Sequence, residues 1–313
     1  MNAPRTRVQR RPVHGVLLLD KPIGLSSNQA LQKVKWLLRA EKAGHTGTLD
    51  PLATGVLPLC FGAAAKFSQL QLDADKTYEA TARLGVRTST GDAEGQVIEE
   101  RPVRITEQDL ARVTAQFTGA IRQIPPMHSA LKKDGKALYE YARAGVQVDR
   151  APRDVTVFKL GIAPVDAVSI RITAAVSKGT YIRTLAEDIG QALGCGAHLT
   201  QLRRTATGCF GLAQCITLQA FEALDEQARL ARLLPPAALL PDHTVIVLPD
   251  EDAGRFLTGL RRHGSWPDAD QVAVFGDRPR ALLGTAHVVR GELIPERLLS
   301  PVELQQMLGP QAP

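Results

Sequence analysis

The sequence predicts an α+β protein in which a large domain with a mixed sheet is followed by a small β-rich domain. Two observations lead to this fold class. Strand-like and helix-like segments occur in mixed order, without the strict strand–helix–strand alternation of a doubly wound sheet. Towards the C-terminus, short apolar runs such as "TVIVLP", "QVAVFG" and "ALLGTAHVV" follow one another at the spacing of a small barrel. The length of 313 residues also exceeds that of one small domain.

The N-terminal part begins with an expected strand and helix. Residues 1–12 contain several arginines but no apolar core, so they predict a disordered basic tail rather than a signal peptide. The run "HGVLLLDKP" predicts a buried strand over 14–19. Ser26 and Gln29 have the spacing of a capping box, which indicates the start of a helix, and Gly44 is its expected end.

Two segments alternate between apolar and polar residues, as half-buried strands do. The first is "KTYEATARL", in which Tyr78 lies on the apolar side, and the second covers 168–176. The second segment runs into an apolar helix face over 182–193, and Gly194 is the expected end of that helix.

A basic insertion separates these two strands. One helix is expected over 106–118, and residues 122–150, which are strongly basic and contain proline, predict a binding loop that carries a short helix. Farther on, "LLPPAALLPDH" has the composition of a linker. We therefore divide the chain into a large domain over 13–240 and a small domain over 244–313.

Charge and cysteine content limit the class of protein. A net charge of +6 favours a polyanionic partner, because each neutralised phosphate releases counterions; a solvated basic surface is the alternative. No apolar run approaches the ~18 residues of a membrane span. Four cysteines without motif spacing predict reduced thiols and a cytoplasmic protein. Cys195 and His198 could begin a zinc site, but a second close pair of ligands is missing.

The most unusual segment is "AGHTGTLDPLATGVLPLCFG", a loop followed by an apolar strand. It carries one carboxylate, Asp50, directly before Pro51, a pattern that commonly forms a turn. Gly47 and Gly55, however, would allow a backbone or a flat ligand to approach closely. A carboxylate in this setting suits nucleophilic catalysis if a cation keeps it ionised. Arg183 lies off the apolar face of its helix and is the candidate cation.

Two tyrosines are candidates for holding a base. Aromatic residues make up only 4% of the chain, yet Tyr78 and Tyr181 are both flanked by basic residues, as in sites that stack nucleic-acid bases. A core position is the alternative for Tyr78. Phosphate-binding loops, GxSxG and HExxH motifs are absent from the sequence, and "GDAEG" predicts a tight turn.

Four segments, taken together, resemble a known family. They are "GVLLLDKPIGLSSN", "AGHTGTLDPLATGVLPLCFGAAAKF", "DKTYEATARLGVRTSTGDAEG" and "SKGTYIRTLAEDIGQALGCGAHLTQLRR", in this order. They closely resemble the TruB family of tRNA pseudouridine-55 synthases, over 15–95, 123–145 and 177–204. The resemblance implies a pseudouridine synthase fold with a mixed, largely antiparallel sheet and a central cleft. It also implies an RNA-gripping insertion and a C-terminal domain similar to PUA RNA-binding modules.

The resemblance implies roles for individual residues. Asp50 matches the catalytic aspartate, Tyr78 the tyrosine that stacks on the target uracil, and Arg183 the arginine that pairs with the aspartate. Tyr181 and Leu202 match residues that line the uridine pocket. His45 matches the histidine that helps to hold the T loop, and Lys66 matches a lysine near the site. His128 stands where many relatives carry Tyr.

The expected function is therefore isomerisation of uridine-55 in the T loop of tRNA, with Asp50 as the nucleophile and the flipped base on Tyr78. The family uses no metal and no cofactor, and we expect a monomer without a membrane or obligatory protein partner. Two alternatives remain at this level: an RNA-binding or tRNA-folding module, and an acid-dependent hydrolase, which would need Mg²⁺ and further carboxylates. The sequence leaves open whether Asp50 attacks the uracil or C1′ of the ribose.

Overall fold

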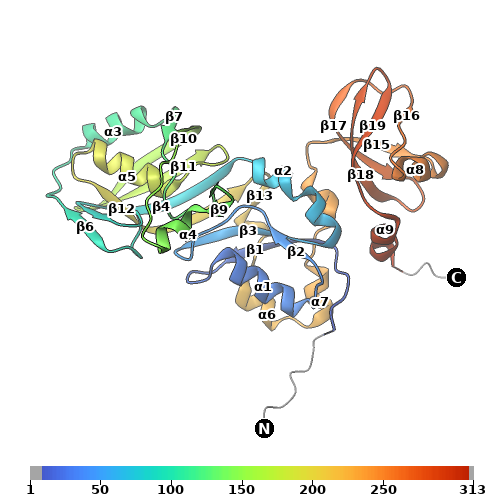
Figure 1. Cartoon of the computed structure of the whole chain (residues 1–313), viewed down its shortest axis with the longest axis horizontal. Coiled ribbons are helices and arrows are strands. Elements are labelled where there is room, and N and C mark those ends of the chain that lie inside the picture. The colour runs from blue at the N-terminus through green and yellow to red at the C-terminus, as the bar shows by residue number, and fades with distance from the viewer. Residues whose placement is uncertain (1–8, 310–313) are drawn as a thin grey trace, which may run out of the picture.

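A ten-stranded mixed sheet dominates the computed structural model, which describes residues 9–309. The sheet is formed by β1 (Gly15–Lys21), β2 (Ala43–His45), β3 (Ala53–Phe61), β4 (Lys76–Leu84), β7 (Gly119–Gln123), β10 (Arg153–Asp166), β11 (Ser169–Val176), β12 (Ala197–Thr207), β13 (Phe210–Gly211) and β14 (Ile216–Thr217). Their order is β14-β1-β3-β12-β4-β11-β10-β7, with β2 beside β3 and β13 beside β12 (Figure 1). Because only β1–β14 and β3–β12 pair in parallel, the predicted mixed, largely antiparallel sheet is confirmed.

Helices cover both halves of this sheet and bury its apolar side chains. α3 (Glu107–Gln116) and α5 (Ile182–Ala192) pack on the half that holds β4, β10 and β12 (Figure 1). α1 (Ser27–Leu37) and α6 (Leu218–Ala223) pack on the half that holds β1 and β2. Shorter elements complete the large domain: α2 (Ser68–Asp73), α4 (Leu138–Arg143), α7 (Glu226–Ala231), the 3₁₀ turns η1 (Gly62–Phe67), η2 (Leu212–Gln214) and η3 (Pro236–Leu239), and the hairpin strands β5 (Val86–Thr88), β6 (Val97–Glu100), β8 (Lys132–Lys133) and β9 (Lys136–Ala137).

The two halves of the sheet meet at a short parallel contact between β3 and β12. The paired positions are Leu202 with Ala53, Arg203 with Thr54, and Arg204 with Gly55. Gly55 has a φ of +103°, and a Cβ there would lie 2.1 Å from the carbonyl oxygen of Arg204, so only glycine permits this approach. The contact begins three residues after position 50, which places the unusual loop at the junction of the two halves.

The start of α1 follows the prediction, but its end does not. Ser26 caps the helix, and Ser26 and Gln29 form the expected capping box. The helix then ends at Leu37, whereas Gly44 belongs to β2. The chain turns at Arg39, which takes a left-handed φ of 53° while Leu38 remains fully buried. A non-glycine residue therefore ends the helix, which the sequence pattern did not indicate.

The prediction that residues 1–12 form a disordered tail is wrong for Arg11. The backbone N–H of Arg11 donates to the carbonyl of Arg39 at 2.8 Å, and its carbonyl accepts from Glu41 at 3.1 Å. Its guanidinium also forms an ion pair of 2.6 Å with Glu226 in α7. Ordered structure thus starts before residue 12, and residues 1–8 of the predicted tail lie outside the described part.

The predicted linker is packed rather than free. Val16 in β1 exchanges two backbone hydrogen bonds of 2.8 Å with Leu234. Leu239 and Leu240 are 1% and 5% exposed, because they join an apolar cluster with Val16, Leu18 and their neighbours on the face of β1 that points away from α1. The segment therefore extends the core towards the C-terminal sheet.

The C-terminal sheet has five strands in the order β15-β17-β18-β19-β16 (Figure 1). Its elements are β15 (Thr244–Leu248), α8 (Asp250–Leu257), β16 (Arg262–His263), β17 (Ala269–Gly276), β18 (Ala281–Val289), β19 (Glu292–Leu298) and α9 (Pro301–Leu308). The three short apolar runs quoted from the sequence supply β15, β17 and β18, as expected. Within residues 9–309, no helix is both long enough and apolar enough to cross a membrane.

Candidate active site

The loop between β2 and β3 is tied to the sheet by a buried arginine. Arg204 in β12 is 1% exposed; its Nε donates to the carbonyl of Val56 at 2.7 Å and its Nη2 to the carbonyl of Gly47 at 3.2 Å. Gly47 has a φ of +81°, a conformation that favours glycine. The start of the loop is thus fixed at Gly47, and Asp50 lies farther along the same loop, at the junction of the sheet halves.

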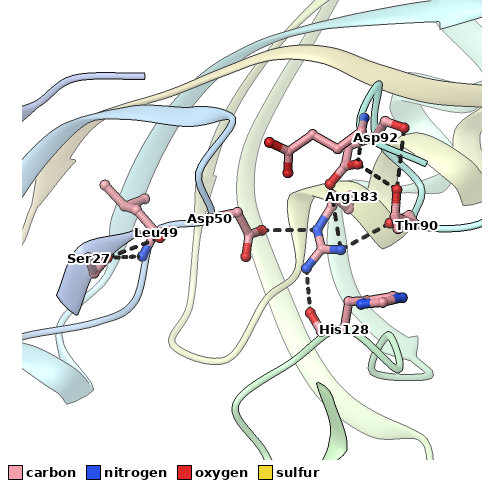
Figure 2. A network of polar contacts seen from close by, with 8 residues as sticks. Ser27, Leu49, Asp50, Thr90, Asp92, His128 and Arg183 are labelled. Carbon is pink, nitrogen blue, oxygen red and sulfur yellow. Dashed lines mark hydrogen bonds and ion pairs between the residues drawn. The ribbon is translucent and has the colours of Figure 1, made fainter. Parts of the chain in front are cut away.

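Arg183 brings α5 into contact with this loop. Its Nε lies 3.0 Å from Oδ2 of Asp50. Figure 2 marks this ion pair with a dashed line. The same guanidinium donates to the carbonyls of Thr90, at 3.0 Å, and His128, at 2.7 Å. Only 5% of the Arg183 side chain is exposed, whereas 36% of that of Asp50 is exposed. One carboxylate oxygen is therefore held by a buried cation while the group stays open to a ligand.

A second carboxylate lies on the other side of Arg183. Oδ2 of Asp92 is 3.7 Å from Nη1 of Arg183, and the Asp92 side chain is 4% exposed. Its Oδ1 accepts from the hydroxyl of Thr90 at 2.5 Å and from the backbone N–H of Glu94 at 3.1 Å (Figure 2). The segment "GDAEG" does form a turn, as predicted, but this turn also presents a buried carboxylate to the site.

A cavity of about 330 Å³ opens beside Asp50. This volume is at the lower end of the range for small-ligand pockets, about 300–1,000 Å³. The residues that line it come from both halves of the sheet, from α5 and from the basic insertion, and they include Asp50, Lys76, Tyr78, His128, Ser129, Leu131, Tyr181, Arg183, Leu202 and Arg204. The structure thus gathers Asp50, Tyr78, Tyr181, Arg183 and Leu202, five of the seven residues singled out from the sequence.

Position 128 contributes to the site through its backbone. The carbonyl of His128 accepts the 2.7 Å hydrogen bond from Arg183, and the residue lines the cavity. Because any residue supplies a carbonyl, a histidine in place of tyrosine leaves this contact intact. The neighbouring Ser129 is 6% exposed, so the insertion forms one wall of the cavity.

The electrostatics of the site are set by burial and by nearby cations. Burial raises the pKa of Asp50, and the adjacent Arg183 opposes this rise. Burial lowers the pKa of Lys76 to about 8, and Arg204 contributes to this lowering. Burial likewise lowers the pKa of Lys21 to about 8, although the carboxylate of Asp50 acts against it. The cations near Asp50 therefore favour its ionised form against the cost of burial.

Two of the residues singled out from the sequence are not among those that line the cavity. His45 ends β2, and burial, with Arg204 nearby, lowers its pKa, which favours the neutral imidazole. Lys66 lies in η1 and contacts the C-terminal domain: its Nζ donates to the carbonyl of Leu298 at 2.9 Å and pairs with Glu303 at 2.6 Å. The expectation that Lys66 lies near the site is therefore corrected, because its ammonium group binds the C-terminal domain instead.

Three polar residues of the site were missed by sequence reasoning: Asp92, Lys76 and Arg204. Asp92 was hidden in a turn pattern, where aspartate is common for local reasons. Lys76 and Arg204 lie in strands, and their burial could have been noticed from their places on otherwise apolar faces. Within residues 9–309, no group of three or more His, Cys, Asp or Glu side chains is arranged to hold a metal ion.

Comparisons with known proteins show the family of this chain. The N-terminal domain of the TruB family pseudouridylate synthases matches residues 35–182, and the tRNA pseudouridylate synthase B C-terminal domain matches residues 183–240. A curated relative, tRNA pseudouridine synthase B of Verminephrobacter eiseniae, is 62% identical and covers 99% of this chain and 96% of its own. The chain belongs to the TruB family. A second TruB relative, tRNA pseudouridine synthase B of Ralstonia nicotianae, is 58% identical over 93% of this chain and 95% of its own.

Solved structures place the TruB fold in a wider group. The protein in the structure of a Cbf5–Nop10–Gar1 complex aligns with a TM-score of 0.69 and 25% identity, over 93% of this chain and 86% of its own. A structure of an H/ACA RNP bound to a substrate RNA containing 2′-deoxyuridine aligns with a TM-score of 0.67 and 25% identity, over 92% and 86%. As a TruB protein, the chain is a tRNA pseudouridine synthase, an isomerase that acts on RNA.

Proposed function

We propose that this protein isomerises uridine-55 in the T loop of tRNA to pseudouridine, with Asp50 as the nucleophile and the flipped target base against Tyr78. One observation carries the proposal: the carboxylate of Asp50, paired with the buried Arg183 at 3.0 Å, faces a cavity whose wall contains Tyr78. A carboxylate held by a permanent cation and open on one side is suited to covalent catalysis.

The reaction rearranges one nucleoside without adding or removing atoms. The bond between C1′ and N1 breaks, a bond between C1′ and C5 forms, C5 loses a proton and N1 gains one. Asp50 bonds transiently to the substrate while the base turns, and the carboxylate must later leave. Arg183 keeps Asp50 ionised before attack and stabilises the negative charge that returns to the carboxylate when it departs.

The dimensions of the cavity require the target base to leave its stack. A space of about 330 Å³ admits a single base but no paired helix. Extrusion of a base costs a few kcal/mol, and stacking on an aromatic side chain returns roughly 1–3 kcal/mol. Tyr78 is the aromatic platform, with Leu202 and Tyr181 as further walls.

The rest of the molecule serves RNA binding in this proposal. The catalytic domain covers 13–240, and its basic insertion over 122–150 grips the tRNA beside the cavity that it walls. His45 holds the T loop at the end of β2. The C-terminal residues 244–313 form a PUA-like module. The protein acts as a monomer in the cytoplasm, on the T stem-loop of tRNA, with no cofactor and no obligatory protein partner.

The test is pseudouridine formation on an unmodified tRNA transcript in the presence of EDTA. We expect the wild type to form product at the T-loop uridine and Asp50→Ala to form none while it still binds the transcript. If the wild type binds tRNA but forms no product, the proposal fails in favour of an RNA-binding module. If Asp50→Ala forms product at the wild-type rate, the role of Asp50 as the nucleophile is refuted.

A further inference from the structure

The start of α1 and the residues just before it form hydrogen bonds with the backbone on both sides of Asp50. The hydroxyl of Ser27 donates to the carbonyl of Leu49 at 3.0 Å and accepts from the N–H of Leu49 at 2.7 Å. The backbone N–H of Gly24 donates to the carbonyl of Pro51 at 2.8 Å. The residues before and after Asp50 are therefore both hydrogen-bonded to one short stretch of chain.

The Ser27 hydroxyl is fully committed to this contact. Ser27 is 1% exposed, and Figure 2 shows its side chain directed at the backbone of Leu49, which leads into Asp50. A hydroxyl can donate one hydrogen bond and accept others, so this single oxygen satisfies both backbone groups of Leu49. Without it, two buried polar groups next to Asp50 would lose their partner.

Neighbouring features make the clamp rigid. Ser27 is the first residue of α1, so its backbone belongs to a regular helix. The side chain of Leu49 is 3% exposed and joins the main apolar cluster, so this residue is held by both its backbone and its side chain. Pro51 has a restricted φ. The backbone is thus fixed at both neighbours of Asp50, whose side chain contacts Arg183 and lines the cavity.

We propose that Ser27 is a positioning residue for the reaction: its hydroxyl holds Leu49 so that the carboxylate of Asp50 stays aligned with both Arg183 and the cavity. The proposal rests on the role of Asp50 as the nucleophile. Rate depends steeply on such alignment, because a displacement of about 1 Å can cost on the order of 100-fold in rate. The clamp holds the backbone of Leu49, which lines the cavity, and adjoins Asp50 rather than the aromatic wall or the basic insertion, so it affects the chemical step more than the binding of RNA.

Ser26 provides a matched control for Ser27. Both serines belong to the start of α1, but the Ser26 hydroxyl accepts from the N–H of Gln29 and makes no contact with the Asp50 loop. Ser27→Ala and Ser26→Ala each remove one oxygen. The measurements are the single-turnover rate at saturating enzyme, the dissociation constant for an unmodified tRNA transcript, and the Tm.

We expect Ser27→Ala to lower the single-turnover rate roughly 10- to 100-fold while tRNA affinity changes by no more than about threefold. Ser26→Ala is expected to keep the single-turnover rate within about twofold of the wild type although its Tm falls, because it loses a helix cap. Equal rates for the two variants at equal Tm loss would overturn the proposal, since Ser27 would then act only through stability.

A second pair of variants covers the case in which Ser27→Ala does not fold. Ser27→Thr and Ser27→Val have the same shape and differ in the hydroxyl, so the size of the side chain cancels in their comparison. We expect the Thr variant to be roughly 10-fold or more faster than the Val variant in single turnover. Equal rates would refute a role for the hydroxyl.

Asp50→Asn, measured in the same assay, separates the two proposals. If Asp50→Asn is inactive but the serine variants behave alike, the positioning role of Ser27 fails and the proposed function stands. If Asp50→Asn retains wild-type activity, the proposed role of Asp50 fails, and the positioning proposal fails with it.

Discussion

The Nε of Arg183 lies 3.0 Å from Oδ2 of Asp50, and only 5% of the arginine side chain is exposed. This ion pair joins a loop of one sheet half to a helix of the other. A guanidinium in this position stays charged at all relevant pH values, so it acts on Asp50 under every condition in which the enzyme works.

The first prediction concerns the pH dependence of catalysis. Burial raises the pKa of Asp50 above its ordinary value, and Arg183 lowers it. The ionised form of Asp50, the proposed nucleophile, is lost as the pH falls through this pKa, so the single-turnover rate should decline on the acid side. Arg183→Met removes the opposing charge, and the acid limb should therefore move to higher pH. Arg183→Lys, which keeps a charge, should move it less. An acid limb that stays in place in Arg183→Met would refute this link.

The second prediction concerns Asp92. Asp92→Asn removes a negative charge whose Oδ2 lies 3.7 Å from Nη1 of Arg183. Both side chains are almost fully buried. Arg183 then loses one of the groups that fix its orientation, and we expect the single-turnover rate to fall by roughly 10-fold or more, with little change in tRNA affinity. Glu94→Gln is the control, since Glu94 is exposed and its contact with Asp92 uses the backbone N–H. Equal losses in the two variants would contradict this role.

The third prediction concerns the aromatic wall of the cavity. Tyr78→Phe keeps the ring and should retain tRNA affinity, whereas Tyr78→Ala should weaken tRNA binding or lower the rate by an amount equivalent to roughly 1–3 kcal/mol. Both quantities can be measured with the same transcript. A loss of binding in Tyr78→Phe as large as in Tyr78→Ala would mean that the hydroxyl, and not the ring, is the important group.

The fourth prediction concerns the contact between the domains. Lys66 and Glu303 pair at 2.6 Å with side chains 37% and 21% exposed. A double-mutant cycle with Lys66→Met and Glu303→Gln should give a coupling energy of about 0.5–1 kcal/mol in thermal or denaturant unfolding, because the pair is partly screened by water. Glutamine at 303 preserves the capping box with Ser300, so the helix start is kept. Strictly additive effects would show that the pair contributes nothing.

The fifth prediction concerns salt. Lys132, Lys136 and Arg143 are exposed on the basic insertion that walls the cavity. Affinity for tRNA should fall steeply as salt rises. If Lys132 neutralises one phosphate, Lys132→Gln should reduce the slope of log affinity against log salt by about 0.7–0.9. The exposed Lys159 on β10, replaced by Gln, controls for net charge. A flat salt profile in the wild type would remove the basic insertion from RNA binding.

Local patterns in the sequence predicted many elements correctly. Alternation predicted β4 and β11, whose inward side chains Tyr78 and Ile172 are buried. The capping box predicted the start of α1. These features depend on neighbours within a few residues, so sequence carries them directly. The end of α1 was missed because the chain turns at Arg39, which has a left-handed φ. A non-glycine residue takes this conformation only where the surrounding structure holds it, so the local sequence does not indicate it.

The sequence by itself determined the family, the fold class and the set of unusual residues around Asp50. Only the tertiary structure decided which charges meet. Asp92 has the local pattern of a turn residue, and Lys66 lies near Asp50 in the sequence, yet the structure turns Asp92 towards Arg183 and Lys66 towards Glu303. The physical reason is that the burial and pairing of a charge depend on segments far apart in the chain. Asp50 likewise reaches Arg183 at the junction of the two sheet halves, which touch at Gly55.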